Sequence, residues 1–302
     1  MESGDPVSDY LVLVPFYSNL AYLRETLMSV VAQTDAHWRA VVVDDSPVDP
    51  GVRELVAAIA DERIEIVRNE RNLGVAGSFN RCFDIAHELG ADLAMILHAD
   101  DLLAPGFIAT VRGAHERWPD AACVATRASI IGADGRPRRT LPDTVKRGMW
   151  PRRVDRLEGE QGLRRLLRGQ FFYCPGVSYD VGKLAHPAWN ERWTQVMDLE
   201  LYARVLLDGG AIQLLDEPLF VYRRHEGSMT QVNSATLVRT EEETALSREL
   251  AEEARRRGWR SAGRAGTARV AVRLQSMLRA GALVMRARPR SAWRALRLAL
   301  SR

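Results

Sequence analysis

Four short apolar runs in the first hundred residues, separated by segments in which apolar residues recur at helical spacing, constrain the fold most strongly. The runs cover residues 10–14, 40–43, 64–67 and 93–97. Runs of this length bounded by polar residues are typical of buried parallel strands. Alternation of such strands with helices predicts an α/β fold with a mostly parallel sheet flanked by helices on both faces. Right-handed crossovers would make it a doubly wound, Rossmann-like sheet.

The fourth run stops at two adjacent carboxylates, Asp100 and Asp101, and Pro105 follows soon after. In open α/β sheets, ligands bind in the crevice beyond the carboxyl ends of the strands. Carboxylate oxygens there suit Mg²⁺ or Mn²⁺, so Asp100 is our first candidate for a metal ligand and Asp101 our second. The alternative is that both aspartates only cap a helix that begins near Pro105.

In the rest of the chain, predicted strands and helices alternate less regularly. A helix is expected from about residue 105 to 118, and a Pro-, Arg- and Gly-rich loop over 140–158. A helix over 196–207 would end at a Gly-Gly pair, a common helix stop. The remaining expected elements are an apolar segment at 123–131, a short helix at 163–167, and strands at 177–181, 212–215 and 219–222. Beyond residue 231 the pattern is helical.

The bulk composition is that of an ordinary globular protein, with 302 residues, 46% hydrophobic and 27% charged. This length fits one large α/β domain with an appendage, or two domains. The three cysteines lie far apart, so neither a zinc site nor a disulfide framework is indicated, and a reducing cytosol is the simplest compartment. The chain begins without a signal-peptide pattern, and no apolar run approaches the roughly 18 residues of a membrane span. A cytoplasmic protein is expected.

Charge is distributed unevenly along the chain. No Asp or Glu follows Glu253, whereas the last 49 residues contain 14 arginines and no lysine. The net charge of +3 therefore divides into −11 for the first 253 residues and +14 for the rest. We expect a main domain over 1–230 and a helical, Arg-rich C-terminal extension over 231–302.

Within this extension, apolar and basic residues both recur at helical spacing. The apolar positions are Val270, Leu274, Met277, Gly281, Met285, Trp293, Leu296 and Leu300, and the arginines among them are Arg269, Arg273, Arg286, Arg290, Arg294 and Arg297. A basic amphipathic helix with an interfacial Trp favours docking of 265–302 on an anionic membrane, here the inner face of the cell membrane. The alternative is packing on the core or on a second subunit of a homo-oligomer, with arginines paired to the acidic stretch 241–253.

Several separated motifs agree in order and spacing with one family. They are Val14-Pro15-Phe16-Tyr17, Gln33 with Trp38, Val41-Val42-Val43-Asp44-Asp45-Ser46, Asn72-Leu73-Gly74 with Asn80, His98-Ala99-Asp100-Asp101, Asp198 with Leu201, and Tyr222-Arg223-Arg224-His225 with Ser228. On these motifs the chain resembles a family-2 glycosyltransferase of the GT-A fold, which moves sugars from nucleotide diphosphates. The resemblance covers roughly residues 10–230.

The resemblance implies a role for each matching residue. Asp198 is expected to be the catalytic base, and the metal ligands are expected among Asp100, His98 and His225. The residues expected to bind the nucleotide sugar are Pro15, Tyr17, Asp44, Asp45, Asn72, Gly74, Asn80, His98, Ala99, Asp100 and Arg223. Of the adjacent arginines, either Arg223 or Arg224 would hold phosphate in a bidentate manner.

Each role has a structural alternative. Asp44 and Asp45 would otherwise form a turn that caps the next helix, and Asp198 would be an acid favoured by the helix dipole at a helix N-terminus. Asn72 and Asn80 suit structural caps better than ligand contacts, and His225 would otherwise be a surface-loop residue. Acceptor-binding loops are expected over 134–160 and 183–195, with Trp189 and Trp193 either stacking on sugars or simply packing.

The chain also departs from the family pattern at three positions. His98 replaces the usual first Asp of the metal motif, and imidazole binds Mn²⁺ better than Mg²⁺, so Mn²⁺ is the favoured cofactor. Met197 replaces an acid that often precedes the catalytic Asp, and Phe79 replaces an Arg common before Asn80.

The expected function is that of an inverting, metal-dependent hexosyltransferase with a UDP- or dTDP-sugar donor. The acceptor would be a saccharide, a lipid-linked glycan or a small molecule, and no nucleic-acid partner is expected. One base carboxylate supports a single displacement at the anomeric carbon. The first alternative is a non-catalytic nucleotide-sugar or glycan-binding module. The second is a nucleotidyltransferase, but its Gly- and Lys/Arg-rich loop is missing after the first strand.

Overall fold

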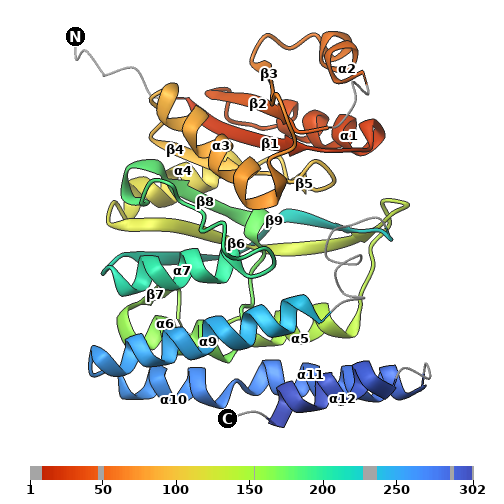
Figure 1. Ribbon diagram of the computed structural model, residues 1–302. Helices are drawn as coiled ribbons and strands as arrows, with labels where there is room; N and C mark the ends of the chain where they lie inside the picture. Colours follow the sequence, from red (N-terminus) through yellow and green to blue (C-terminus); the bar gives the residue numbers. More distant parts are fainter. Residues whose placement is uncertain (1–8, 47–50, 153, 227–236, 286–288, 301–302) are drawn as a thin grey trace. The chain divides into compact units, whose positions relative to one another are not determined.

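The computed structural model of the protein describes residues 9–46, 51–152, 154–226, 237–285 and 289–300 (Figure 1). The chain divides into two compact units. Unit 1 contains Met1–Arg156, Phe172–Glu191 and Gly210–Arg224, and unit 2 contains Leu157–Phe171, Arg192–Gly209 and His225–Arg302. The boundary expected at residue 230 falls among residues outside the described part, so that division stays a prediction.

Unit 1 is built on one mixed sheet. Its strands are β1 (Tyr10–Phe16), β2 (Trp38–Asp44), β3 (Ile64–Arg68), β4 (Leu93–Ile96), β5 (Leu102–Leu103), β6 (Ala121–Gly132), β8 (Val177–Asp180) and β9 (Ala211–Arg224), in the order β3-β2-β1-β4-β8-β6-β9-β5. A further short strand, β7, covers Arg156–Glu158. The four strands expected in the first hundred residues, β1 to β4, pair in parallel, as the alternating pattern predicts.

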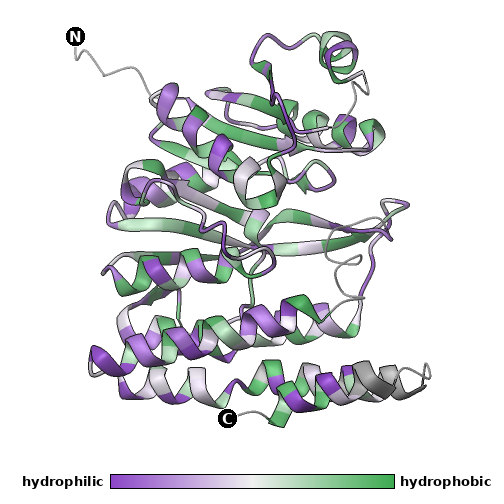
Figure 2. Ribbon diagram, viewed as in Figure 1, coloured by the Kyte–Doolittle hydropathy of each residue, from purple (hydrophilic) through white to green (hydrophobic). Residues whose placement is uncertain are grey.

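Helices cover both faces of this parallel half. Their bounds are α1 (Leu20–Val31), α2 (Val52–Ile59), α3 (Gly74–Glu88) and α4 (Phe107–Arg117). Alternate residues of β1, such as Val12 and Val14, join a core with Leu27 of α1 and Val111 of α4. Because side chains alternate along a strand, the intervening residues face the other side of the sheet, where α3 contacts β1. Figure 2 shows β1 and β2 hydrophobic along most of their length.

The second half of the sheet departs from the expected pattern. β8 is antiparallel to both β4 and β6, so the sheet is mixed beyond β4. The two strands expected at 212–215 and 219–222 form one long strand, β9. The exposed residues Asp216, Glu217 and Pro218 interrupt the apolar pattern there, but the twelve-residue strand β6 keeps the chain extended, with a register shift at that point.

The loop expected over 140–158 is wrong, because the structure has a helix, α5 (Leu141–Met149), followed by β7. The Thr140 side chain caps α5 by accepting from the main-chain N–H of Asp143, and Pro142 occupies the first turn, where its missing N–H costs nothing. Arg224 and Tyr173 bind the Asp143 carboxylate, so tertiary contacts hold the helix in place.

The helices of unit 2 are α6 (Gly159–Arg168), α7 (Met197–Leu207), α9 (Val238–Arg256), α10 (Arg260–Ala268), α11 (Val270–Met285) and α12 (Pro289–Leu300). α6 packs against α7 and α10, and α11 packs against α12 (Figure 1). Arg286 and the side chains of Met285 and Arg290 lie outside the described residues. Among the described helices, none is both long and apolar enough to cross a bilayer.

Candidate active site

The carboxyl ends of the parallel strands gather the acidic residues that the sequence singled out. Asp44 ends β2 and is 2% exposed, and its Oδ1 accepts from the main-chain N–H of Ser46 at 3.0 Å. Its Oδ2 pairs with Arg68, at the end of β3, over 3.2 Å. Asp44 therefore ties two neighbouring strand ends together, and its expected contact with a base or ribose stays a prediction.

Asp45 holds the start of α3 against the end of β2. Its Oδ1 accepts from Asn69 Nδ2 at 3.0 Å and from the main-chain N–H of Leu73 at 2.9 Å. Asn72 Oδ1 in turn accepts from the N–H of Gly74, whose φ of 70° lies in the left-handed region that glycine tolerates. The capping alternative is present here, although the helix capped is α3 and not the next helix along the chain.

A cluster of three potential metal ligands follows β4. One ligand atom from each of His98, Asp100 and Asp101 lies within 4.8 Å of the others. Asp101 is fully buried, and among the described residues its Oδ2 atom has no hydrogen-bond partner. A buried carboxylate oxygen without a donor is unfavourable unless a cation accompanies it. This donor set of one imidazole and two carboxylates therefore fits a divalent ion such as Mn²⁺.

Burial, with the neighbouring Asp100 carboxylate as the second cause, raises the pKa of Asp101 well above its usual range. The main-chain N–H of Arg223 acts against this by donating to Asp101 Oδ1 at 2.8 Å. A cation bound by the cluster would favour the ionised carboxylate, as a nearby opposite charge does.

Arg223 lies at the end of β9 and is only 1% exposed. Its Nε donates to the carbonyl oxygen of Asp100 at 2.9 Å, and its Nη2 pairs with Glu25 of α1 at 2.5 Å. The guanidinium thus holds residues 98–101, here called the metal-motif loop, through a main-chain carbonyl. The direct phosphate contact expected of Arg223 stays a prediction, and in this structure the side chain is engaged elsewhere.

Arg224 forms a bidentate pair with Asp143 of α5, through Nε at 2.8 Å and Nη2 at 2.5 Å. Burial acts to raise the pKa of Asp143, but the hydrogen bonds from Arg224, Thr140 and Tyr173 lower it overall. Arg224 therefore anchors α5 to the end of β9, and this contact competes with the phosphate role expected for it.

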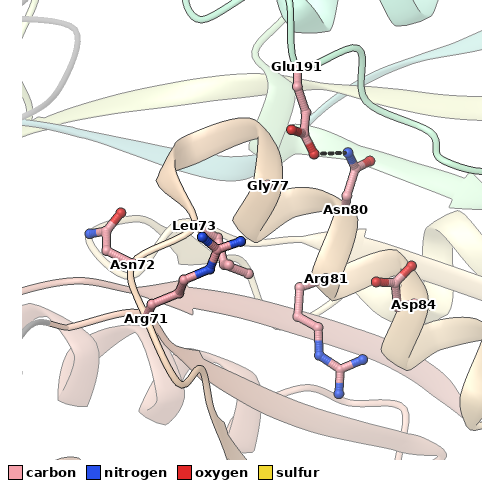
Figure 3. A pocket seen from close by; sticks show the side chains of 8 residues that line it. All are labelled: Arg71, Asn72, Leu73, Gly77, Asn80, Arg81, Asp84 and Glu191. Carbon is pink, nitrogen blue, oxygen red and sulfur yellow. Dashed lines mark hydrogen bonds between the residues drawn. The ribbon is translucent and has the colours of Figure 1, made fainter.

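Asn80 of α3 forms two hydrogen bonds with the main chain of Trp189. Its side chain donates to the carbonyl oxygen of Trp189 at 2.9 Å and accepts from the same residue's N–H at 2.8 Å. A pocket of about 350 Å³ opens beside Asn80, and Figure 3 shows its side chain directed at Glu191. The structural role considered for Asn80 is thus present.

Trp189 and Trp193 do not project as sugar platforms. Trp189 is 1% exposed and packs edge-on against Phe79 and Phe83 of α3. Trp193 is 4% exposed, with the guanidinium of Arg192 4.5 Å from its ring centroid. The simple packing alternative is the one observed for both side chains.

Asp198, the expected base, lies in the first turn of α7 in unit 2 and is partly exposed. Its Oδ1 accepts from the N–H of Leu199 at 2.8 Å, and its Oδ2 accepts from Gln170 Nε2 at 2.7 Å. Sequence reasoning missed Gln170, because it lies 28 positions earlier and no local signal connects the two.

The remaining expected site residues are spread over both units. Pro15 and Tyr17 lie at the end of β1, where Tyr17 is 56% exposed, and Ala99 lies between His98 and Asp100. His225 belongs to unit 2, so its expected role as a metal ligand stays a prediction. Ser228, part of the same sequence motif, lies outside the described residues.

Comparison with known proteins gives a consistent family. Residues 11–181 match the profile described as "Glycosyl transferase family 2". A putative teichuronic acid biosynthesis glycosyltransferase of Bacillus subtilis, TuaG, is 35% identical over 77 residues, which cover 25% of this chain and 30% of TuaG. The succinoglycan biosynthesis protein ExoU of Rhizobium meliloti is 26% identical over 218 residues, covering 69% of this chain and 60% of ExoU.

Among solved structures, S. aureus TarS 1–349, crystallised in complex with UDP-GlcNAc, superimposes with a TM-score of 0.60 at 18% identity. The match covers 81% of this chain and 66% of that one, so the present chain spans less than two thirds of each of these relatives. Likeness at this identity supports the fold, and it confirms the GT-A architecture expected from the sequence. Because the family match extends over more than half of its length, the chain belongs to glycosyl transferase family 2.

Proposed function

We propose that this glycosyltransferase moves a sugar from a nucleoside diphosphate to an acceptor hydroxyl, with inversion at the anomeric carbon. The observation that carries the proposal is the cluster of His98, Asp100 and Asp101 beyond the carboxyl end of β4, where α/β sheets bind ligands. Asp101 Oδ2 is buried and accepts no hydrogen bond from the described residues, and His98 Nδ1, itself a candidate ligand, lies 3.8 Å from it.

His98, Asp100 and Asp101 would hold the divalent ion. A bound ion supplies Lewis-acid stabilisation of the charge that develops on the diphosphate leaving group. The chain's own residues orient the cluster, since Arg223 fixes both the Asp100 carbonyl and the Asp101 carboxylate. The imidazole of His98 favours Mn²⁺ over Mg²⁺.

Asp198 would take the proton from the acceptor hydroxyl as that oxygen attacks the anomeric carbon. General base catalysis of this kind contributes typically about 10²–10⁴-fold. From the described residues, its Oδ1 and Oδ2 atoms each accept one hydrogen bond, which orients the carboxylate and leaves lone pairs that can accept a proton. A single base carboxylate is sufficient for one displacement and gives an inverted product.

The similar proteins support a UDP-sugar donor and a saccharide-type acceptor. TarS was crystallised with UDP-GlcNAc, and an Escherichia coli relative, 34% identical over 82 residues, is named a UDP-Glc:alpha-D-GlcNAc-diphosphoundecaprenol beta-1,3-glucosyltransferase. ExoU and TuaG are named for the biosynthesis of polysaccharides. We therefore propose a polysaccharide precursor, free or lipid-linked, as the acceptor.

Release of UDP from UDP-GlcNAc and UDP-glucose by the purified protein with Mn²⁺ tests the proposal. Turnover by the wild type that falls by at least about 100-fold in Asp198→Asn supports it. Binding of either donor without any turnover, with or without a saccharide acceptor, would favour the alternative of a non-catalytic nucleotide-sugar-binding module.

We further propose that residues 265–302 dock on an anionic membrane surface. Nine arginines and no acidic residue occur in this segment. Large apolar side chains remain exposed on both of its helices, namely Val270, Leu274 and Met277 on α11 and Trp293, Leu296 and Leu300 on α12. They account for half of the twelve exposed large hydrophobic residues among the described part of the chain. Each Arg near an anionic leaflet contributes about 1 kcal/mol.

The packing alternative considered for this segment is partly present as well. Small side chains, such as Ala280 of α11 and Ala299 of α12, are buried, and Arg294 pairs with Glu241 of α9 over 2.6 Å. The large apolar side chains of α11 and α12 named above remain exposed despite this packing. A twofold contact with a second copy would bring like-charged surfaces together, which disfavours a dimer through this face.

Co-sedimentation of the full chain with phosphatidylglycerol and phosphatidylcholine vesicles tests the docking. The wild type should pellet with the anionic vesicles alone and be released by salt, while a variant with Trp293, Leu296 and Leu300 each changed to Ser should stay in the supernatant. The exposed Leu141 of α5 provides the control, because Leu141→Ser removes an exposed apolar side chain that does not belong to residues 265–302. Equal pelleting of all three proteins would refute docking through α12.

A further inference from the structure

α6 and α7 lie side by side in unit 2 (Figure 1). The chain that follows α6 brings a side-chain amide to the expected base. Gly162 makes this close packing possible, because a Cβ atom there would lie 3.2 Å from Leu206 Cδ1 and 3.0 Å from the carbonyl carbon of Leu157. Helix α6 ends at Arg168, and its C-cap residue Gly169, with a φ of 147°, lets the chain turn out of the helix. The next residue is Gln170.

Gln170 is partly buried and directs its side-chain amide at Asp198. The donor is Nε2, the acceptor is Asp198 Oδ2, and the distance is 2.7 Å, a short hydrogen bond of the kind expected for a charged acceptor. The other carboxylate oxygen accepts from the main-chain N–H of Leu199. Two donors from two different segments therefore fix the rotation of the carboxylate about its own axis.

We infer that Gln170 is the positioning residue of Asp198, holding the carboxylate in the orientation from which it accepts the proton of the acceptor hydroxyl. The inference rests on the base role proposed above for Asp198. An amide suits this task because it donates a hydrogen bond at every pH and never competes for the proton.

Two substitutions separate this role from a merely structural one. Gln170→Leu removes the donor, and kcat should fall about tenfold. The acid limb of the kcat–pH profile should move to higher pH, because the charged form of Asp198 has lost a hydrogen bond. Gln170→Glu brings a second carboxylate to Asp198, and like charges should move the acid limb further, by about one pH unit or more. Donor KM should change little in both.

Gln195 provides a matched control. It is another partly buried glutamine of unit 2, but its Nε2 atom donates to the carbonyl oxygen of the neighbouring Thr194 and not to Asp198. Gln195→Ala should leave the position of the acid limb unchanged. An acid limb that stays in place in both Gln170 variants, or moves equally in Gln195→Ala, overturns the inference.

A measurement that needs no substrate complements the kinetics. The pKa of Asp198 can be read from its side-chain ¹³C carboxyl resonance, assigned by its loss in Asp198→Asn, and it should be higher in Gln170→Leu than in the wild type. An unchanged pKa shows that the contact does not act on the carboxylate. If instead this pKa shifts as expected but Asp198→Asn retains full transfer, the positioning contact exists and the base role of Asp198 is what fails.

Discussion

The main-chain N–H of Arg223 donates a 2.8 Å hydrogen bond to the buried carboxylate of Asp101, across 122 positions of sequence. The same residue binds the Asp100 carbonyl oxygen and Glu25 through its side chain. Thr26 of α1 also donates to the Asp101 carbonyl oxygen, at 2.8 Å. The metal-motif loop is therefore held by α1 and β9 together, which makes its geometry a property of the folded sheet.

Weakening this support should weaken metal binding. Arg223→Lys keeps the main-chain N–H donor but loses the guanidinium, two of whose nitrogens bind the Asp100 carbonyl oxygen and Glu25. We expect the Mn²⁺ concentration for half-maximal turnover to rise about 10–100-fold, as when other residues that orient metal ligands are replaced. The control is Arg127→Lys, which alters an exposed ion pair with Asp216. An identical Mn²⁺ dependence in all three proteins would show that Arg223 does not position the cluster.

The identity of the residue at position 98 should set metal preference. The wild type is expected to turn over donor faster with Mn²⁺ than with Mg²⁺, because imidazole suits Mn²⁺ better. His98→Asp supplies a hard oxygen in its place and should bring the two rates close together. Initial rates at saturating metal decide the matter, and a wild type equally active with both ions would mean that His98 does not reach the metal.

A single displacement has a stereochemical signature. If Asp198 acts as the one base, the anomeric configuration of the product should be opposite to that of the donor, which ¹H NMR of the transferred sugar reports through its anomeric coupling. A product that retains the donor configuration would require a covalent nucleophile or a different mechanism and would remove Asp198 from the role proposed here.

Helix α9 is expected to support the site through Glu242. This carboxylate accepts hydrogen bonds from the main-chain N–H groups of Thr194 and Gln195, just before α7 begins, at 3.1 and 2.7 Å. Glu242→Ala should lower the free energy of unfolding by about 1 kcal/mol and reduce kcat as well. Urea unfolding and turnover are the measurements, with Glu252→Gln, an exposed position on the same helix, as control.

A buried histidine should make stability depend on pH. Burial lowers the pKa of His115 in α4 from 6.5 to about 4, and its Nε2 lies 3.0 Å from Ser178 Oγ. Between these pH values the histidine is protonated in the unfolded state and neutral in the folded state. The free energy of unfolding therefore falls as the pH falls from about 6.5 to 4, by up to about 3 kcal/mol. Below pH 4 His115 is protonated in both states and causes no further loss.

His115→Gln removes this titration and should flatten the dependence of the unfolding free energy on pH in that window. Chemical denaturation at several pH values between 4 and 7 measures the slope. The variant His37→Gln, whose parent side chain is 65% exposed, should keep the wild-type slope. Parallel curves for wild type and His115→Gln would show that the histidine is not kept neutral by the fold.

The sequence by itself determined the parallel half of the sheet and the residues at its edge. Short apolar runs predict the strands β1 to β4, and apolar residues at helical spacing predict the helices between them. Both signals can be read from neighbouring residues, and alternation of the two element types predicts the layered sheet. The polar residues that end each strand then meet at one edge, since parallel strands share their direction. Asp44, Asp45, His98 and Asp100 could therefore be proposed without any structure.

Only the tertiary structure decided which of these groups contact one another. Asp101 was the second metal candidate in the sequence, but its burial and its hydrogen bond from the main-chain N–H of Arg223 are seen only in the folded chain. Asp198 likewise accepts from Gln170, and both partners lie far away along the chain. Trp189 looked available for a sugar, but packing against α3 buries it. Local pattern gives the type of an element, whereas burial and hydrogen-bond partners arise between segments that meet only when the chain is packed.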